Sequence, residues 1–124
     1  MENVIASTFD TTTIEGQIKA FNAQNGSATS MKEMEEEQVV TVTDILIHKD
    51  EIDQYGKIEE AEITTLYTEG EDGTTTLFAS ISATVGKSAK ALVPLLEQME
   101  KLNVKVVKAQ SKQGQTFLNL QLVQ

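Results

Sequence analysis

Few side chains in this sequence could carry out catalysis or hold a metal ion. There is no cysteine, which excludes disulfides, thiolate metal sites and thiol catalysis. His48 is the only histidine, and no nucleophile stands at a diagnostic spacing from it. Because it follows the apolar run 45–47, we expect an exposed histidine at the end of a strand. The sequence therefore predicts no enzyme, no metal site and no cofactor.

Three further patterns are weak matches to ligand sites. The glutamates at 33 and 35–37 are more typical of a solvated face than of a cation site. Residues 69–73 lack the alternating ligands of a calcium loop, so a turn is expected there. Gly86-Lys87-Ser88 lacks the upstream glycine of a phosphate loop, since position 81 is isoleucine.

Aromatic rings and lysines are better candidates for a binding function. Alternation in the predicted strands places Phe21, Phe78 and Phe117 on outer faces, where a ring can stack on a base or be covered by a loop. All ten basic residues are lysines, so bidentate reading of guanine in a duplex is not expected. A groove that follows a phosphate backbone needs only point charges. The candidate phosphate contacts are Lys49, Lys57, Lys105, Lys108 and Lys112.

The charge is unevenly distributed along the chain. Residues 33–72 hold fourteen acids and two lysines, a local charge of −12, whereas residues 73–124 carry +4 and residues 1–32 carry −1. The net charge of −9 should repel a nucleic acid at long range. Binding would need the lysines to line one groove with the acids facing away. We expect such binding to be weak, with a shallow salt dependence, because few phosphates are neutralised.

Most of the chain is expected to form strands. Residues 13–21 alternate and predict a strand, with Gly16 at a bulge. Residues 22–30 predict a turn and residues 31–37 one helical turn. Further strands are predicted over 38–49, 58–68 and 74–82, with a polar loop at 50–57 and a hairpin turn at 69–73.

One helix and a closing hairpin follow. The helix is predicted from a single apolar face: Val85, Ala89, Leu92, Leu96, Met99 and Leu102. Pro94 predicts a kink or break, and Asn103 a stop. Strands are expected over 104–110 and 115–123, with Leu118, Leu120 and Leu122 on the core face.

The element order favours a small β-barrel. We expect one mainly β domain over residues 1–124, an oligonucleotide-binding (OB-fold) barrel of five strands with one helix between strands 3 and 4. The first residues have no basic region and no long apolar run, so no signal peptide is predicted. No stretch approaches the length of a membrane span.

Several segments, in this order and spacing over some 120 residues, resemble one known family. They are Thr8-Phe9-Asp10-Thr11, Glu15-Gly16-Gln17-Ile18-Lys19, Phe21-Asn22-Ala23-Gln24, Tyr55-Gly56, residues 75–85, Val104-Lys105-Val106-Val107 and Leu120-Gln121-Leu122. The chain resembles the single-stranded DNA-binding protein of small Bacillus-type phages that replicate linear genomes by protein priming. The resemblance implies an OB-fold barrel that coats displaced single strands, acts in the host cytoplasm and has the phage replicative DNA polymerase as a further partner.

The resemblance also implies particular site residues. Tyr55 and Phe78 match two positions whose aromatic rings stack on bases in that family. A third falls on His48, where the family more often has tyrosine. Two other classes of function remain open. One is an acidic protein-binding module or DNA mimic that occupies a basic partner, and the other is a β-barrel that works by self-assembly.

Overall fold

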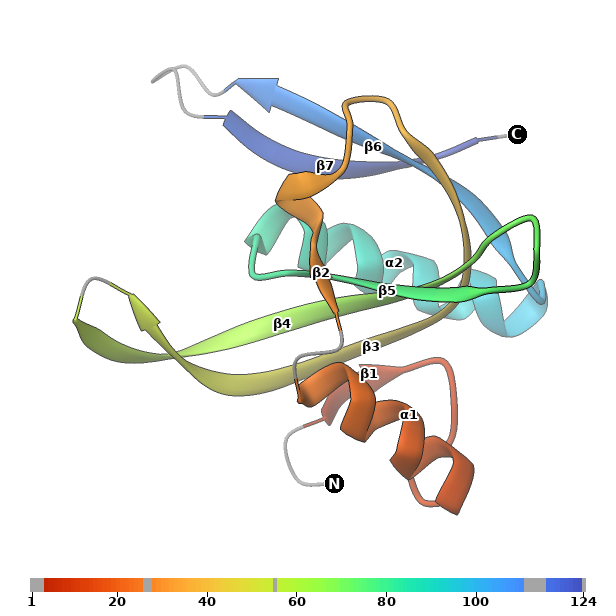
Figure 1. The fold of residues 1–124 in the computed structure, drawn as a ribbon, viewed down its shortest axis with the longest axis horizontal. Helices are drawn as coiled ribbons and strands as arrows, with labels where there is room; N and C mark the ends of the chain where they lie inside the picture. Colours follow the sequence, from red (N-terminus) through yellow and green to blue (C-terminus); the bar gives the residue numbers. More distant parts are fainter. Residues whose placement is uncertain (1–3, 26–27, 55, 111–115, 124) are drawn as a thin grey trace.

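A single curved sheet organises the chain. The computed structural model describes residues 4–25, 28–54, 56–110 and 116–123, which contain seven strands, two α-helices and one 3-10 turn. In chain order these are β1 (Val4–Ser7), α1 (Ile14–Gln24), β2 (Thr29–Ser30), η1 (Met31–Glu33), β3 (Val39–Gln54), β4 (Lys57–Glu69), β5 (Thr75–Ser80), α2 (Ala83–Gln98), β6 (Leu102–Gln110) and β7 (Thr116–Leu122). The sheet order is β2-β5-β4-β3-β6-β7, and β1 pairs with β3 (Figure 1).

The prediction of a mainly β chain is confirmed, but the predicted counts are wrong. The described residues form seven strands instead of five and two helices instead of one. The helix expected after the third strand is α2, which lies between β5 and β6. No helix among the described residues is long and apolar enough to cross a membrane.

The main core fills the inner face of the curled sheet, where α2 packs. The predicted apolar face of this helix is confirmed over the residues that α2 contains. Four of them are buried: Val85, Ala89, Leu92 and Leu96. They pack with inward side chains of β3, β4 and β6, among them Ile45, Leu66 and Val104. The helix contains Pro94 without a break and ends at Gln98, so the predicted stop at Asn103 is wrong. Met99 is 56% exposed, and Leu102 opens β6 instead of closing the helix.

The segment from β2 to β3 spans the gap between β5 and β6. Thr29 and Ser30 pair in parallel with β5, and further on the Glu37 amide donates to the Val106 carbonyl at 2.7 Å. Met31 and Met34, from the predicted helical turn, are buried in the main core. This segment therefore leads from the β5 edge of the sheet to the start of β3 beside β6 (Figure 1, orange).

Helix α1 packs on the other face of the sheet, where its residues and those of the strands beneath form the outer cluster, and here the sequence prediction was wrong. Residues predicted as a strand over 13–21 form α1, because Thr13 caps the helix by accepting a hydrogen bond from the Gly16 amide at 3.0 Å. Gly16, Ala20 and Ala23 recur at helical spacing and are the buried residues of α1. Ala20 and Ala23 pack on Leu46 and Tyr67. Gly16 thus lies in a helix and not at a bulge.

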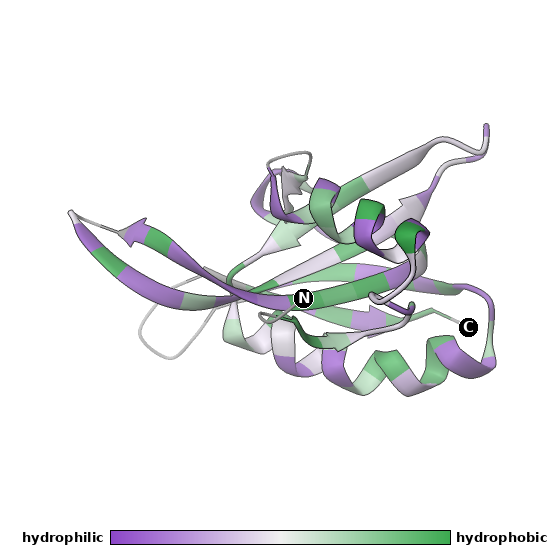
Figure 2. Ribbon diagram, turned by 90° about the horizontal axis from the view of Figure 1, so that it is seen from below, coloured by the Kyte–Doolittle hydropathy of each residue, from purple (hydrophilic) through white to green (hydrophobic). Residues whose placement is uncertain are grey.

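The β3–β4 hairpin extends well beyond the body of the protein. The two strands pair from Thr41 with Glu69 out to Gln54 with Lys57, so the predicted polar loop at 50–57 is mostly strand. We call residues 49–62 the arm; its described part, residues 49–54 and 56–62, projects away from both helices (Figures 1 and 2). Cross-strand pairing continues there although most side chains are charged, since both faces of the arm meet water.

The shorter turn between β4 and β5 is confirmed as a hairpin. The Gly70 amide donates to the Thr74 carbonyl at 2.8 Å, and the Gly73 amide donates to the Gly70 carbonyl at 3.0 Å. Gly73 has a φ of 81°, a left-handed conformation that favours glycine. The closing hairpin also pairs as predicted over β6 and β7, where Leu118 and Leu120 are buried but Leu122 is exposed.

Candidate functional site

Two of the predicted stacking residues lie on opposite faces of the sheet. Across the strands, Phe78 pairs with Leu66 and Leu66 with Ile45, which puts Phe78 on the inner face. It is half-buried against the main core, so the prediction that it points outward is wrong. The reason is that both faces of β5 are covered, because Leu77 packs against the outer cluster. No single row of stacking rings can therefore include both Phe78 and a residue of the outer face.

His48 is on that outer face and is buried, with 1% of its surface exposed. The expectation of an exposed strand-end histidine is wrong, since β3 continues to Gln54. Its cross-strand neighbours are Ile63 and Val4, and neither ring nitrogen has a hydrogen-bond partner among the described residues. Burial lowers the pKa of His48, while the nearby Asp50 carboxylate opposes that shift. A buried neutral imidazole offers no free face to a base in this conformation.

The remaining aromatic candidates lie in separate parts of the chain. Phe21 lies on α1 and is 61% exposed. The exposed side chains of Ile14 and Ile18 lie on the same face of this helix. The backbone of Phe117 pairs with Ala109 in the β6–β7 ladder, but its side chain lies outside the described residues. Tyr55 also lies outside them. In the sequence it is flanked by Gln54 and by Gly56.

Among the lysines predicted to contact phosphate, two form ion pairs with glutamates and two others form none with a described residue. Lys49 lies 3.4 Å from Glu60 and Lys105 lies 4.0 Å from Glu37, measured from ammonium nitrogen to carboxylate oxygen. Lys57, at the far end of the arm, and Lys108, towards the end of β6, have no such partner within the described part of the chain. The β3–β4 and β6–β7 hairpins that carry these two lysines extend towards the same side of the molecule (Figures 1 and 2). Lys112 lies outside the described residues.

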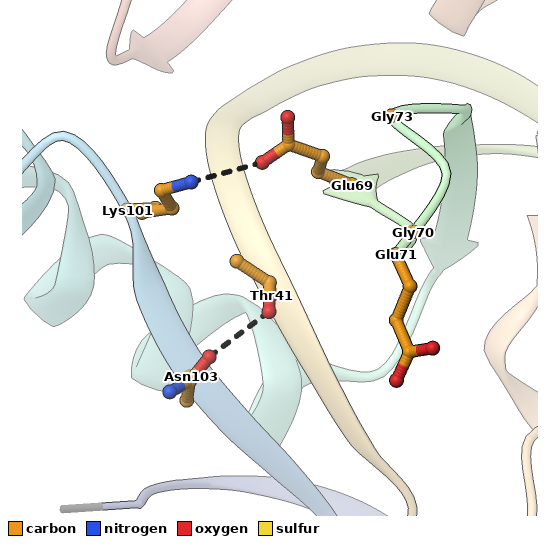
Figure 3. Close-up of a pocket in the computed structure, with 7 residues that line it drawn as sticks. All are labelled: Thr41, Glu69, Gly70, Glu71, Gly73, Lys101 and Asn103. Atoms are coloured by element: carbon orange, nitrogen blue, oxygen red, sulfur yellow. Dashed lines mark hydrogen bonds and ion pairs between the residues drawn. The ribbon is translucent and has the colours of Figure 1, made fainter.

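A polar pocket of about 490 Å³ lies between the β4–β5 turn and the start of β6. Lys101 approaches Glu69 to 3.2 Å and the Thr41 hydroxyl donates to the Asn103 side-chain oxygen at 2.9 Å (Figure 3). The Glu71 carboxylate points away from Lys101 (Figure 3). The pocket has two carboxylates and one ammonium group, a net negative charge that disfavours phosphate. Its ion pair and hydrogen bond instead connect the end of β4 and β3 to the start of β6.

Two shallow depressions meet at Ile81, where β5 leads into α2. The first, of about 350 Å³, is lined by Ala28, Ser30, Lys32, Ile63, Ala79, Ser80 and Ile81. The second, of about 280 Å³, is lined by Ala61, Glu62, Ile81, Ser82, Ala83, Gly86, Lys87 and Lys90. We call them together the Ile81 groove. The sequence reading did not single out its lysines, because Lys87 and Lys90 fit the solvated side of a helix and Lys32 a short charged stretch.

Comparison with known proteins identifies the family. A family model described as "Phage Single-stranded DNA-binding protein" matches residues 1–123. The chain belongs to this family. Single-stranded DNA-binding proteins of Bacillus phages PZA and phi29 are 39% and 38% identical to it over 122 residues, which cover 97% of this chain and 95% of each relative. That of Bacillus phage B103 is 33% identical over 99% of both chains. No solved structure matches.

The resemblance seen in the sequence is therefore confirmed. The relatives are named as DNA-binding proteins, in agreement with the prediction of no enzymatic activity. The match extends through the arm, the Ile81 groove and both hairpins, so every surface described above lies within the family's shared region.

Proposed function

We propose that this family member binds single-stranded DNA without sequence preference and coats displaced strands during phage DNA replication. The observation that carries the proposal is the match over residues 1–123 to a family of that name, with relatives that span almost the same length. All ten basic residues are lysines, which suits a protein that contacts the phosphate backbone without reading the bases.

The order of the strands supports an open OB-fold barrel over the whole chain as one domain. The series β3-β4-β5-α2-β6-β7, with β3 paired to both β4 and β6, is the arrangement expected of such a barrel, with β3 as its first strand. In OB folds, ligands bind on strands 2 and 3 and on the loops after strands 1 and 4. The counterparts here are β4, β5, the end of the arm and the β6–β7 connection.

Among the predicted contacts, we assign stacking first to Tyr55 and phosphate contacts to Lys57, Lys108 and Lys112. The hairpins that hold Lys57 and Lys108 extend to the same side, and neither lysine is engaged by an acid of the described chain. Phe21 and Phe117 are further stacking candidates, and Lys49 and Lys105 further phosphate contacts. Their exposed ion pairs are worth only about 0–1 kcal/mol, so a phosphate can displace those carboxylates.

Tyrosine fluorescence tests the proposal directly. The chain has two tyrosines and no tryptophan, and Tyr67 is buried with its hydroxyl donating to the Lys19 carbonyl at 2.7 Å. We expect oligothymidine to quench the emission saturably at low salt, while a duplex of equal length does not. Tyr67→Phe should retain the quenching and Tyr55→Phe should lose it, with gel mobility reporting binding in both. No quenching and no mobility shift at any accessible concentration would rule out strand binding.

The acidic arm favours one second candidate, a protein-binding surface for a basic partner. Residues 49–62 hold six acids and two lysines and project from the body. The phage replicative DNA polymerase is the partner we propose. In a pull-down without DNA, replacing Glu51, Glu59 and Glu60 by glutamine should weaken capture of the polymerase. Equal capture by the wild type and this variant would exclude the arm as the contact.

A further inference from the structure

We infer that the Ile81 groove holds part of the sugar-phosphate backbone of the bound single strand, with Lys32 and Lys87 as phosphate contacts. This inference rests on the proposed function and adds a location to it. The groove crosses β4 and β5 between η1 and the first half of α2, so most of its lining comes from helices and strands.

Charge separates this groove from the rest of the protein. Its lining includes three lysines and one glutamate, a charge of +2, so the remainder of the chain carries −9 − 2 = −11. Lys90 lies 2.8 Å from Glu62, whereas Lys32 and Lys87 have no ion pair with any described residue. An anion that avoids most of this surface is therefore attracted to the groove.

The shape of the groove also suits an extended strand. Its apolar lining includes Ile63, Ala79 and the 42%-exposed Ile81, and Ile81 is shared by the depression that holds Lys32 and the one that holds Lys87. A nucleotide chain that places phosphates at these two lysines can lay a sugar or base edge on the isoleucines. The two residues on either side of Ile81 in the sequence have short side chains that leave this lining accessible: Ala79, Ser80, Ser82 and Ala83.

Position in the fold connects the groove to the rest of the proposed interface. Ala61 and Glu62 line one end of it, and these residues begin the arm that leads outward to Lys57. Strands β4 and β5 are also the elements on which an OB-fold barrel binds its ligand. The groove therefore extends the proposed interface from the hairpins onto the body of the protein.

A pair of double variants with equal charge tests the inference. Lys32→Gln with Lys87→Gln removes the two groove lysines. Lys19→Gln with Lys101→Gln removes two that pair with Asp44 and Glu69 outside the groove. Oligothymidine affinity is measured by gel mobility from low to moderate salt, with thermal unfolding as the folding check. The slope of log affinity against log salt should fall by about 1.4 in the groove variant, about 0.7 per lost contact, and by much less in the control. At about 50 mM salt, the groove variant should bind on the order of 50-fold more weakly.

Glu62→Gln provides a change in the opposite direction. It frees Lys90, so the slope should steepen by about 0.7 and the affinity should rise at low salt. A wild-type protein that binds no single strand would refute the proposed function itself. A wild type that binds, with equal slopes in the two double variants, would overturn only the groove, because bulk charge would then explain the loss.

Discussion

Two buried glycines, each in a helix, should respond in opposite ways to the same substitution. At Gly16 in α1, an added Cβ would lie 1.7 Å from the Asp10 carbonyl oxygen and 2.7 Å from its carbon. At Gly86 in α2, the nearest atom outside its own helix would be the Thr64 hydroxyl oxygen at 3.4 Å, an ordinary contact. Gly→Ala therefore creates a backbone clash at the first site and adds only a methyl group at the second.

The magnitudes follow from three terms. Replacing glycine by alanine inside a helix stabilises it by about 1 kcal/mol at either site. At Gly16 the clash costs about 1–3 kcal/mol, since a backbone oxygen cannot rotate away as a side chain can. The same Asp10 carbonyl accepts from the Thr13 hydroxyl, so moving it also disturbs the helix cap, worth about 1 kcal/mol. Gly16→Ala should lose about 2 kcal/mol, and Gly86→Ala should be neutral or gain up to about 1 kcal/mol.

Urea unfolding followed by circular dichroism measures both variants, and thermal unfolding provides a second reading. For a chain of this length, a change of 1 kcal/mol shifts Tm by about 3–5 °C, so Gly16→Ala should melt about 6–10 °C below the wild type. The reasoning would be refuted if Gly16→Ala matched the wild type. A loss at Gly86 as large as that at Gly16 would equally refute it, because the two sites would then not differ in available space.

Two pH effects follow from buried titratable groups. Burial lowers the pKa of His48 below its usual 6.5, so the unfolded state binds more protons than the folded state as pH falls. The free energy of unfolding, measured in urea, should therefore decrease from pH 7 to pH 5 by up to about 1.4 kcal/mol per pH unit. His48→Phe should remove this dependence, and an unchanged profile would contradict the burial of the imidazole. Burial raises the pKa of Tyr67, with a smaller contribution from Asp44, so stability should fall as pH rises above about 10. Absorbance titration should then show a delayed tyrosine step that is absent in Tyr67→Phe, and a Tyr67 that ionises at its ordinary pKa would contradict the packing of the outer cluster.

The parts of the fold that the sequence predicted best are those where one pattern excludes the alternatives. The apolar residues of α2 fit only a helical period, and Leu118 and Leu120 fit only a strand with one buried face. The turn at 69–73 was readable because its two glycines match a tight hairpin. In each case local propensity and tertiary packing agree.

The misread segments are those where local pattern and packing differ. In α1 the buried residues are glycine and alanine, which carry little hydropathy signal, while Ile14, Ile18 and Phe21 are exposed. The visible apolar residues therefore indicated the wrong face and the wrong period. In the arm, cross-strand pairing overrides a sequence of charged residues that reads as a loop. His48 was taken for a strand end because that extension of β3 could not be foreseen.

The predicted binding residues depended on those elements, which explains why they did not come together as one site. Phe78 was placed outside because only one face of β5 was expected to be covered, whereas the outer cluster, which includes Ala20 and Ala23 of α1, covers the second. The lysines of the Ile81 groove come from η1 and α2, which lie far apart in the sequence. Their proximity is a property of the sheet and cannot be derived from spacing along the chain.

The acidic balance of the protein is compatible with the proposed strand coating, because the lysines outside the proposed contacts form ion pairs with acids. Of the lysines with described ion pairs, Lys19 and Lys101 are held at 2.8 Å and 3.2 Å by acids remote from the groove. Lys32, Lys57, Lys87 and Lys108 are not held in this way by described residues. Under the proposed function, a strand would therefore be attracted to these lysines on a surface that otherwise repels it, which would limit the number of phosphate contacts and favour weak, easily displaced binding. In the coating role proposed above, a small number of contacts would favour release of the strand, and adding lysines across the surface would oppose it.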